Sequence, residues 1–215
     1  SKGETPGNSY FTFHGTGNKS SRRTMDGMNF SDVDASGGSG VQQAVPNQLA
    51  VQESTVQTGG ASAEAEVAGL WINLVPREGG NQFSGQFAMN GSYPSFQGDN
   101  LTPALIARGV PTPGSIKRLY DVGGGVGGPI RRDRLWFYAS PHWWGTESYV
   151  PGAFYNKTHG TPVFTPDPSR QGYTNQPHHN DTIRLTWQAA AKHKISTMSE
   201  IQGTCSCFNG LDRGN

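Results

Sequence analysis

The chain is poor in apolar residues and has no long apolar run. Hydrophobic residues make up 33% of its 215 positions and the mean hydropathy is −0.59, which is low for a compact soluble core. No stretch of about 18 consecutive apolar residues occurs, so a transmembrane helix is excluded. A transmembrane strand is not excluded, because its signal is only an alternation over about 10 residues.

The net charge is close to zero, and cysteine is rare. Seventeen basic and 16 acidic residues give a net charge of +1, so no global field directs the chain to nucleic acid, and no nucleic-acid partner is expected. The two cysteines, Cys205 and Cys207, lie in a Gly/Asn-rich stretch. We expect a loop pair, oxidised together or with another partner, in preference to a zinc site, which usually needs four ligands.

Catalytic motifs are missing as well. The glycine run at residues 123–128 is followed by neither a Lys-Ser/Thr pair nor a helix start, so nucleotide binding is disfavoured. No Gly-x-Ser-x-Gly elbow has an identifiable His and acid, and the histidines show no ligand spacing. The sequence therefore predicts a protein that is not an enzyme, with no catalytic residue, no metal site and no cofactor.

Glycine and aromatic residues are abundant. Thirty glycines and 14 prolines are typical of disorder, but five Trp, seven Tyr and ten Phe are not, and the combination favours β structure. Residues 1–78 are rich in Gly, Ser, Asn and Gln, with short apolar segments at residues 10–13, 49–51 and 70–75. These segments predict short strands of a small mixed domain.

A regular alternation begins at residue 82. Large apolar residues and glycines occupy one side of an extended chain over residues 82–93, and Gln, Ser, Ala and Asn occupy the other. A solvent-exposed antiparallel sheet also alternates, but strands of soluble proteins average only about 5 to 6 residues. The length of the pattern favours a transmembrane barrel, with Phe83, Phe87, Met89 and Tyr93 toward lipid.

Further strands are expected at residues 120–130, 135–146, 182–188 and 193–202. Short turns at residues 131–134 and 189–192 join two pairs of them. Long connections are expected at residues 94–116, with a short helix at 102–108, and at residues 148–180, which are rich in Pro, Gly, Asn and His. Alternation of short and long connections is typical of outer-membrane barrels.

Four segments carry a family resemblance. They are TMDGM at residues 24–28, VQESTVQTGGASAE at 51–64, GLWINLVPREGGNQFSG at 69–85 and VGGPIRRDRLWFY at 126–138. In this order and spacing they resemble the plug, the plug-to-barrel junction and the first barrel strands of TonB-dependent receptors, in particular of the Oar-like branch.

The resemblance implies a mainly β fold in the bacterial cell outer membrane. Residues 1–78 would be the C-terminal part of a small mixed α/β plug domain. Residues 79–215 would be the first strands and loops, about five strands, of a transmembrane antiparallel β-barrel. Both ends of the chain are then expected to be truncations, because the preceding domain and the remaining strands are not in the sequence.

The family takes up scarce ligands such as metal chelates, vitamins or glycans. The resemblance implies three partners: outer-membrane lipid, an unknown small ligand or glycan, and the inner-membrane energy-transducing TonB complex, reached through a missing N-terminal segment. Aromatic side chains of the long connection, Phe154, Tyr155 and Tyr173, are the candidates for ligand contact, because aromatic rings bury area at low entropic cost. The alternative is that they only pack the connection.

Two rival functions stay open. An Oar-like outer-membrane protein can act at the cell surface, for example in adhesion, without importing anything. A soluble β-rich carbohydrate-binding module would also explain the Trp, Tyr and Asn content. The soluble module predicts folding in water alone, with Phe83, Phe87 and Met89 buried by protein.

Overall fold

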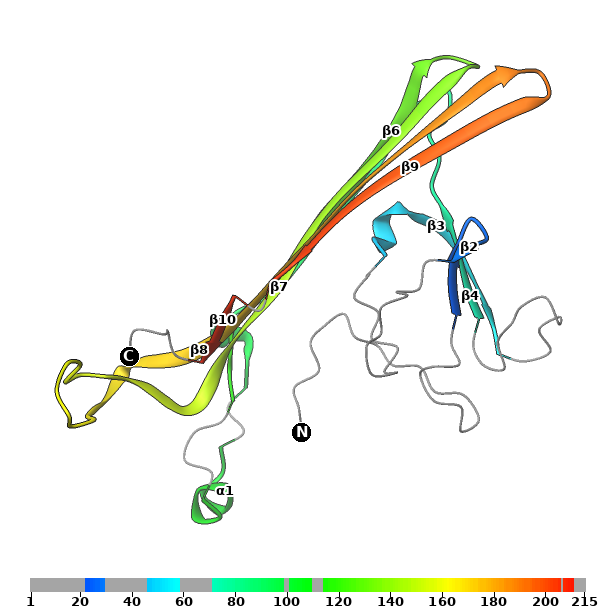
Figure 1. Cartoon of the computed structure of the whole chain (residues 1–215). Helices are drawn as coiled ribbons and strands as arrows, with labels where there is room; N and C mark the ends of the chain where they lie inside the picture. The colour runs from blue at the N-terminus through cyan, green and yellow to red at the C-terminus, as the bar shows by residue number, and fades with distance from the viewer. Residues whose placement is uncertain are drawn as a thin grey trace. The chain divides into compact units, whose positions relative to one another are not determined.

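The computed structural model describes residues 22–29, 46–58, 71–98, 101–109, 114–205 and 207–210 (Figure 1). These residues form two β-sheets and three short helical segments, and neither described sheet closes into a barrel. The mainly β fold class predicted from the sequence is confirmed. The strand predicted at residues 10–13 lies outside the described residues.

The first sheet is short and mixed. Its strand order is β2-β1-β4-β3, and its members are β1 (Arg22–Met25), β2 (Met28–Asn29), β3 (Val51–Gln57) and β4 (Trp71–Pro76). Strand β1 runs parallel to β4 and antiparallel to β2, and β3 is antiparallel to β4. The strand predicted at residues 70–75 is confirmed, whereas of the segment predicted at 49–51 only Val51 lies in a strand, β3, because residues 48–50 form a 3-10 helix.

An Asp-Gly turn connects β1 to β2. Asp26 has a φ of 50° and Gly27 a φ of 78°, which is the backbone that a tight two-residue hairpin requires and that Asp and Gly adopt readily. The turn is held to β4, because the Asp26 N–H donates to the Leu74 carbonyl at 3.0 Å. Met25 and Leu74, which pair in register, are both buried and form the small apolar core of this sheet.

The second sheet contains long strands in the order β10-β8-β7-β6-β5, with β9 also paired to β8. Its members are β5 (Ser84–Ser92), β6 (Ile116–Arg131), β7 (Leu135–Asn156), β8 (Pro166–Ala190), β9 (His193–Thr204) and β10 (Phe208–Gly210). Residues 132–134 turn β6 into β7, and residues 191–192 turn β8 into β9. Both predicted short turns are confirmed, and Figure 1 shows them at the same end of the sheet.

Three short helical segments accompany the strands: η2 (Gln48–Ala50), η4 (Pro94–Phe96) and α1 (Pro103–Ala107). Thr102 caps α1, because its side chain accepts a hydrogen bond from the Leu105 N–H and Pro103 occupies the first helical turn. The short helix predicted at residues 102–108 is therefore confirmed. No described helix has both the length and the apolar character needed to cross a membrane.

The long connection predicted at residues 148–180 is wrong. Strand β7 continues to Asn156 and β8 begins at Pro166, so residues 157–165 alone connect them. Cross-strand contacts such as the Gln171 side-chain amide on the Val150 carbonyl, 3.0 Å away, accompany the pairing. The Pro, Gly and Asn content suggested a loop, but a neighbouring strand supplies backbone partners that override local propensity.

The structure divides into two compact units, and both contain parts of the long strands. Unit 1 comprises residues 1–87, 123–142 and 180–202, and so includes the short sheet. Unit 2 comprises residues 88–122, 143–179 and 203–215.

Candidate functional site: the polar surface that joins the two sheets

Within unit 1, burial on the long strands is the reverse of that in a soluble sheet. On β8, Thr182, Arg184 and Thr186 are buried, whereas the residues between them, Ile183, Leu185 and Trp187, are exposed. Thr186 is 1% exposed and Trp187 is 49% exposed. Because side chains alternate across a strand, one face of the sheet is polar and covered, and the other is apolar and open.

The same arrangement extends to the other strands of unit 1. The exposed apolar face consists of Phe83, Phe87, Val126, Ile130, Ile183, Leu185, Trp187, Ile195 and Ile201. The exposed fraction of Phe83 is 70% and that of Phe87 is 73%. The predicted orientation of these two side chains away from the polar face is confirmed. An exposed apolar face of this extent marks an interaction surface.

Arg184 is the centre of the polar face. Its side chain is 8% exposed and forms ion pairs with two carboxylates, Asp26 in the β1–β2 turn and Glu78 after β4, the latter at 3.1 Å. Lys194 on β9 forms a further ion pair with Glu78. Two strands of the long sheet are therefore linked electrostatically to the short sheet, and the buried arginine has two anionic partners.

The surroundings of Glu78 favour its charged form. Burial alone would raise the pKa of this carboxyl, but the hydrogen bond and charge of Lys194, followed by those of Arg184, outweigh burial and lower the pKa below its ordinary value. Glu78 is therefore ionised near neutral pH, and its two cations remain paired.

A hydrogen-bond network orients the Asp26 turn. The Asn73 side-chain oxygen accepts from the Thr24 hydroxyl at 2.8 Å and from the Gly27 N–H at 3.3 Å. Thr24 is itself buried, and its hydroxyl also accepts from the indole N–H of Trp71 at 2.9 Å. Asp26 is thus presented to Arg184 by a preorganised turn, not by a free side chain alone.

A second polar contact joins the sheets through η2. The buried Asn47 side chain caps η2 by accepting from the Leu49 N–H at 3.0 Å, and its amide donates to the Ser140 carbonyl on β7 at 2.7 Å. The Leu49 carbonyl accepts from the Tyr138 hydroxyl at 2.9 Å and from the Gln86 amide at 2.6 Å. The polar face of the long sheet therefore has hydrogen-bond partners at two places, around Arg184 and around η2.

Glycines on β6 make room for this contact. A Cβ at Gly125 would overlap the Tyr138 hydroxyl, and a Cβ at Gly123 would lie 2.5 Å from the Leu49 side chain. Gly124 lies on the opposite face, beside Phe87. The glycine run therefore lets side chains of η2 and β7 approach the β6 backbone closely, and the predicted two-face alternation of this strand is confirmed.

The predicted ligand-contact residues lie in unit 2, on strands and not in a loop. Phe154 and Tyr155 are on β7 and Tyr173 is on β8, and all three are half-buried. The Arg170 guanidinium lies 4.3 Å from the Tyr155 ring centroid, and the Lys117 ammonium lies 3.2 Å from that of Tyr173. The structure places a cation on each tyrosine face, and ligand contact stays a prediction.

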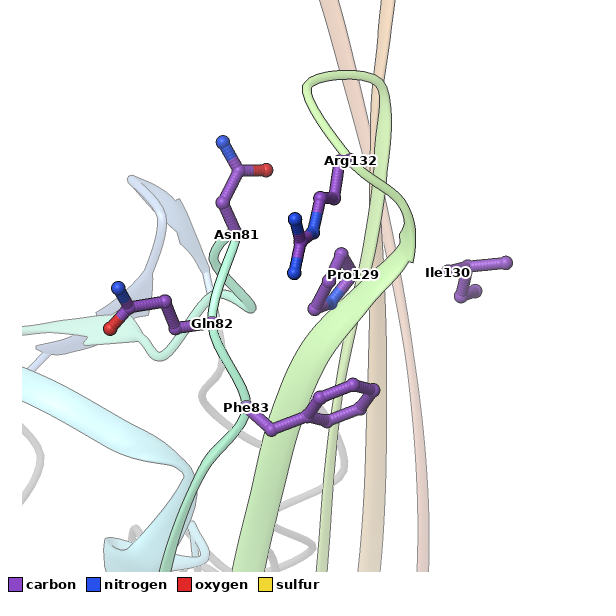
Figure 2. A pocket seen from close by; sticks show the side chains of 6 residues that line it. All are labelled: Asn81, Gln82, Phe83, Pro129, Ile130 and Arg132. Carbon is purple, nitrogen blue, oxygen red and sulfur yellow. The ribbon is translucent and has the colours of Figure 1, made fainter.

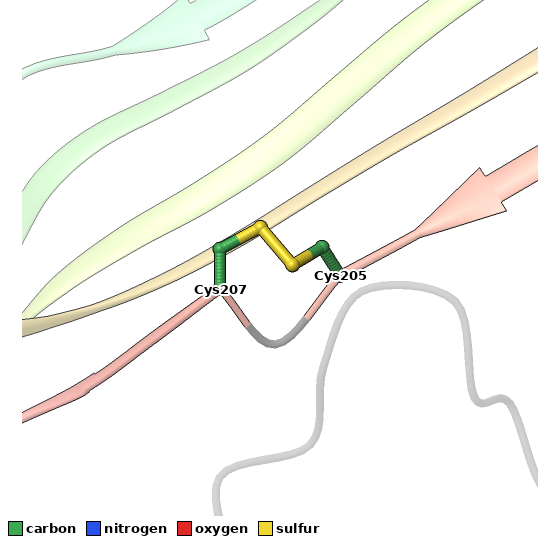
Figure 3. Close-up of a disulfide and its surroundings, with 2 residues drawn as sticks. All are labelled: Cys205 and Cys207. Carbon is green, nitrogen blue, oxygen red and sulfur yellow. A yellow bond between two sulfur atoms is a disulfide. The ribbon is translucent and has the colours of Figure 1, made fainter.

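Cys205 and Cys207 form a disulfide with each other (Figure 3). The Cys207 N–H donates to the Asn175 carbonyl at 3.1 Å, yet Phe208 is the residue that pairs with Asn175 in the register of β10. Cys207 and Phe208 therefore both lie opposite Asn175, which is the arrangement of a β-bulge, and the disulfide lies immediately before Phe208. Of the two expected pairings, the intramolecular one is found.

Sequence reasoning missed Arg184, Glu78 and Asn47 as structural centres. The sequence did contain one indication for Arg184, because it stands between the apolar residues Ile183 and Leu185. When these two side chains lie on the open face of the strand, the arginine side chain must lie on the covered face. Glu78 and Asn47 carried no local signal, since their partners lie on strands far away in the sequence. Among the described residues, no cluster of three or more His, Cys, Asp or Glu side chains has the arrangement of a metal site.

A comparison with known proteins finds a relative that matches part of the chain. No protein family model and no solved structure matches the chain. A stretch of 90 residues, 41% of this chain, is 32% identical to the TonB-dependent transporter Oar of Myxococcus xanthus. The matched stretch spans only 8% of that protein. The comparison thus relates less than half of this chain to a small part of a TonB-dependent transporter.

Proposed function

We propose that this chain is part of an outer-membrane TonB-dependent receptor that binds a ligand and admits it to the cell. In this proposal the short sheet belongs to the plug, and the long strands are the first part of the barrel wall. The ligand is a small molecule, such as a glycan or a metal chelate, that enters without covalent chemistry. Energy comes from the inner-membrane TonB complex.

The observation that carries the proposal is the reversed burial of the long strands. Thr182, Arg184 and Thr186 are buried against the short sheet, and Ile183, Leu185 and Trp187 are open. An apolar outer face and a polar inner face are what a strand requires when lipid lies on one side and a hydrated interior on the other. The partial likeness to a TonB-dependent transporter supports the same interpretation.

The polar inner contact suits a plug. Ion pairs and hydrogen bonds to Arg184, Asn47 and Leu49 join the two sheets, and this contact can exchange partners with water. A dry apolar interface would resist opening more strongly, because separation would expose apolar surface to water. The soluble-module rival predicted that Phe83, Phe87 and Met89 are covered by protein, and their exposure speaks against it.

The first test compares the 215-residue chain in buffer with the same chain in an outer-membrane-like detergent. Circular dichroism and sedimentation velocity are recorded in both. We expect aggregation in buffer that detergent relieves, because the exposed apolar face needs a lipid-like environment. A monomer with a cooperative β-sheet melt in buffer alone would overturn the proposal and favour the soluble module.

A pair of variants tests which face meets lipid. Leu185→Arg places a charge on the apolar face, and Ala191→Arg places the same charge in the exposed β8–β9 turn. An arginine facing lipid destabilises a barrel by about 2–4 kcal/mol at the bilayer midplane and by about 0–1 near its edges. We expect Leu185→Arg to reduce detergent-assisted folding and Ala191→Arg to leave it unchanged; equal behaviour would contradict the assignment.

A further inference from the structure

A cavity lies where the exposed apolar face meets the charged β6–β7 turn, within unit 1. Its volume is about 480 Å³, and its lining residues are Asn81, Gln82, Phe83, Pro129, Ile130 and Arg132 (Figure 2). Figure 2 shows the Arg132 side chain extending from the turn toward Pro129 and the segment that carries Asn81 and Phe83. The lining combines one cation and two amides with an aromatic ring and an aliphatic side chain, which is the chemistry of an amphiphile site.

Arg132 is available to an anion. It is exposed, and no salt bridge joins it to a carboxylate of the described residues. The nearby Asp133 carboxylate is engaged by Asn81, whose amide donates to it at 2.6 Å, and the Asn81 oxygen accepts from the Asp133 N–H at 2.9 Å. The acidic residue of the turn is therefore held by Asn81, and the guanidinium keeps its donors.

The turn region as a whole is basic. Arg131 and Arg134 flank Arg132 and Asp133, and Lys192 lies in the β8–β9 turn; all of these side chains are exposed. The two turns are adjacent in the sheet, because the Gln188 N–H donates to the Arg134 carbonyl at 2.7 Å. An anion near these two turns would therefore meet several basic side chains at the border of the exposed apolar face.

The apolar part of the cavity is continuous with the exposed apolar face. Ile130 is 58% exposed, and Phe83 contacts Phe137 edge to face at a centroid distance of 6.3 Å. Gly128 leaves the space that the Phe83 ring occupies, since a Cβ there would overlap the ring. A hydrocarbon chain lying on this face would thus reach Phe83 and Ile130 with its polar end beside Arg132.

We propose that this cavity binds the phosphodiester headgroup of an anionic phospholipid, with Arg132 on the phosphate and the acyl chains against Phe83 and Ile130. The inference rests on the proposed membrane location of the long strands and adds a specific lipid partner at the turn end. Asn81 and Gln82 are polar residues that also line the cavity. A zwitterionic lipid lacks the net negative charge that the basic turns favour.

The test uses the 215-residue chain in zwitterionic detergent micelles, with tryptophan quenching by lipids that carry brominated acyl chains. Trp136 is a local reporter, because its indole N–H donates to the Asn81 oxygen at 2.8 Å. Brominated phosphatidylglycerol is the anionic probe and brominated phosphatidylcholine the neutral one. Arg132→Gln removes the charge, and Lys157→Gln removes an exposed charge from the β7–β8 connection as a matched control.

We expect phosphatidylglycerol to half-saturate quenching at a lower concentration than phosphatidylcholine, and Arg132→Gln to weaken its binding about fivefold, the effect of about 1 kcal/mol per basic residue at a lipid surface. Lys157→Gln should leave it unchanged. Equal quenching by both lipids, or equal loss in both variants, overturns the lipid site but leaves the membrane location standing. Absence of quenching by either lipid overturns the membrane location itself. Competition by millimolar inorganic phosphate would assign the site to a soluble anion instead.

Discussion

The guanidinium of Arg184 on β8 lies 3.1 Å from the Glu78 carboxylate, although 106 positions separate the two residues. Glu78 follows β4 of the short sheet, and Arg184 lies near the C-terminal end of the long strand β8. This pair, together with Asp26, fixes which face of β8 is turned toward the short sheet.

Arg184→Met should loosen the contact between the sheets. The variant keeps the approximate length of the side chain but leaves Asp26 and Glu78 without their shared cation, and hydrogen bonds to charged groups contribute about 1.5–3 kcal/mol each. Because both carboxylates are about one-third exposed, we expect a loss at the lower end of that range. Hydrogen exchange of β4 in detergent measures the effect, and Arg134→Met, at an exposed turn position, is the control.

Acid should weaken the same contact through Glu78. Its pKa is lowered in the folded chain from an ordinary value of 4.5, so the charged form favours folding. The stabilisation is fully present above that ordinary value and is lost as the pH falls through the lower, folded-state pKa. The pH profiles of β4 hydrogen exchange in the chain and in Glu78→Gln should therefore differ above pH 4.5 and converge as the pH falls through the lower, folded-state pKa. Parallel profiles over the whole range would refute this role.

Gly125→Val should disrupt the packing of β6 against Tyr138. The added side chain would displace the Tyr138 hydroxyl, which would lose its hydrogen bond to the Leu49 carbonyl at 2.9 Å. Overpacking of this kind costs about 1–3 kcal/mol. Gly98→Val is the control, because no atom of the described residues lies within 4 Å of a Cβ there. Thermal melts in detergent compare the two, and an equal decrease would show that space at Gly125 is not critical.

Replacement of both Cys205 and Cys207 by Ser should have a local effect. The disulfide closes a very short loop, for which the chain-entropy model gives only about 1.5 kcal/mol. We expect faster hydrogen exchange at the amides of Cys205 and Cys207, which donate to the Pro177 and Asn175 carbonyls, and little change elsewhere. A global loss of β structure in the double variant would assign the disulfide a larger role than its loop length allows.

The sequence predicted the alternating strands correctly where side chains alone define two faces. In residues 82–93 and 182–188, apolar and polar residues alternate strictly, and the structure keeps Phe83, Phe87 and Ile183 on one open face. The same logic failed at residues 148–180. There the composition resembles a loop, and the strands exist because each has a neighbour to bond with.

The sequence by itself determined the two-sided character of the long strands, the short turns, the α1 cap and the mainly β class, because these depend on residues close together in the chain. Only the tertiary structure decided that β7 and β8 extend through residues 148–156 and 166–180, and that Arg184 meets Asp26 and Glu78. Strand pairing and ion pairing join residues distant in the sequence, so their partners are fixed by the register of the sheets and by no local pattern.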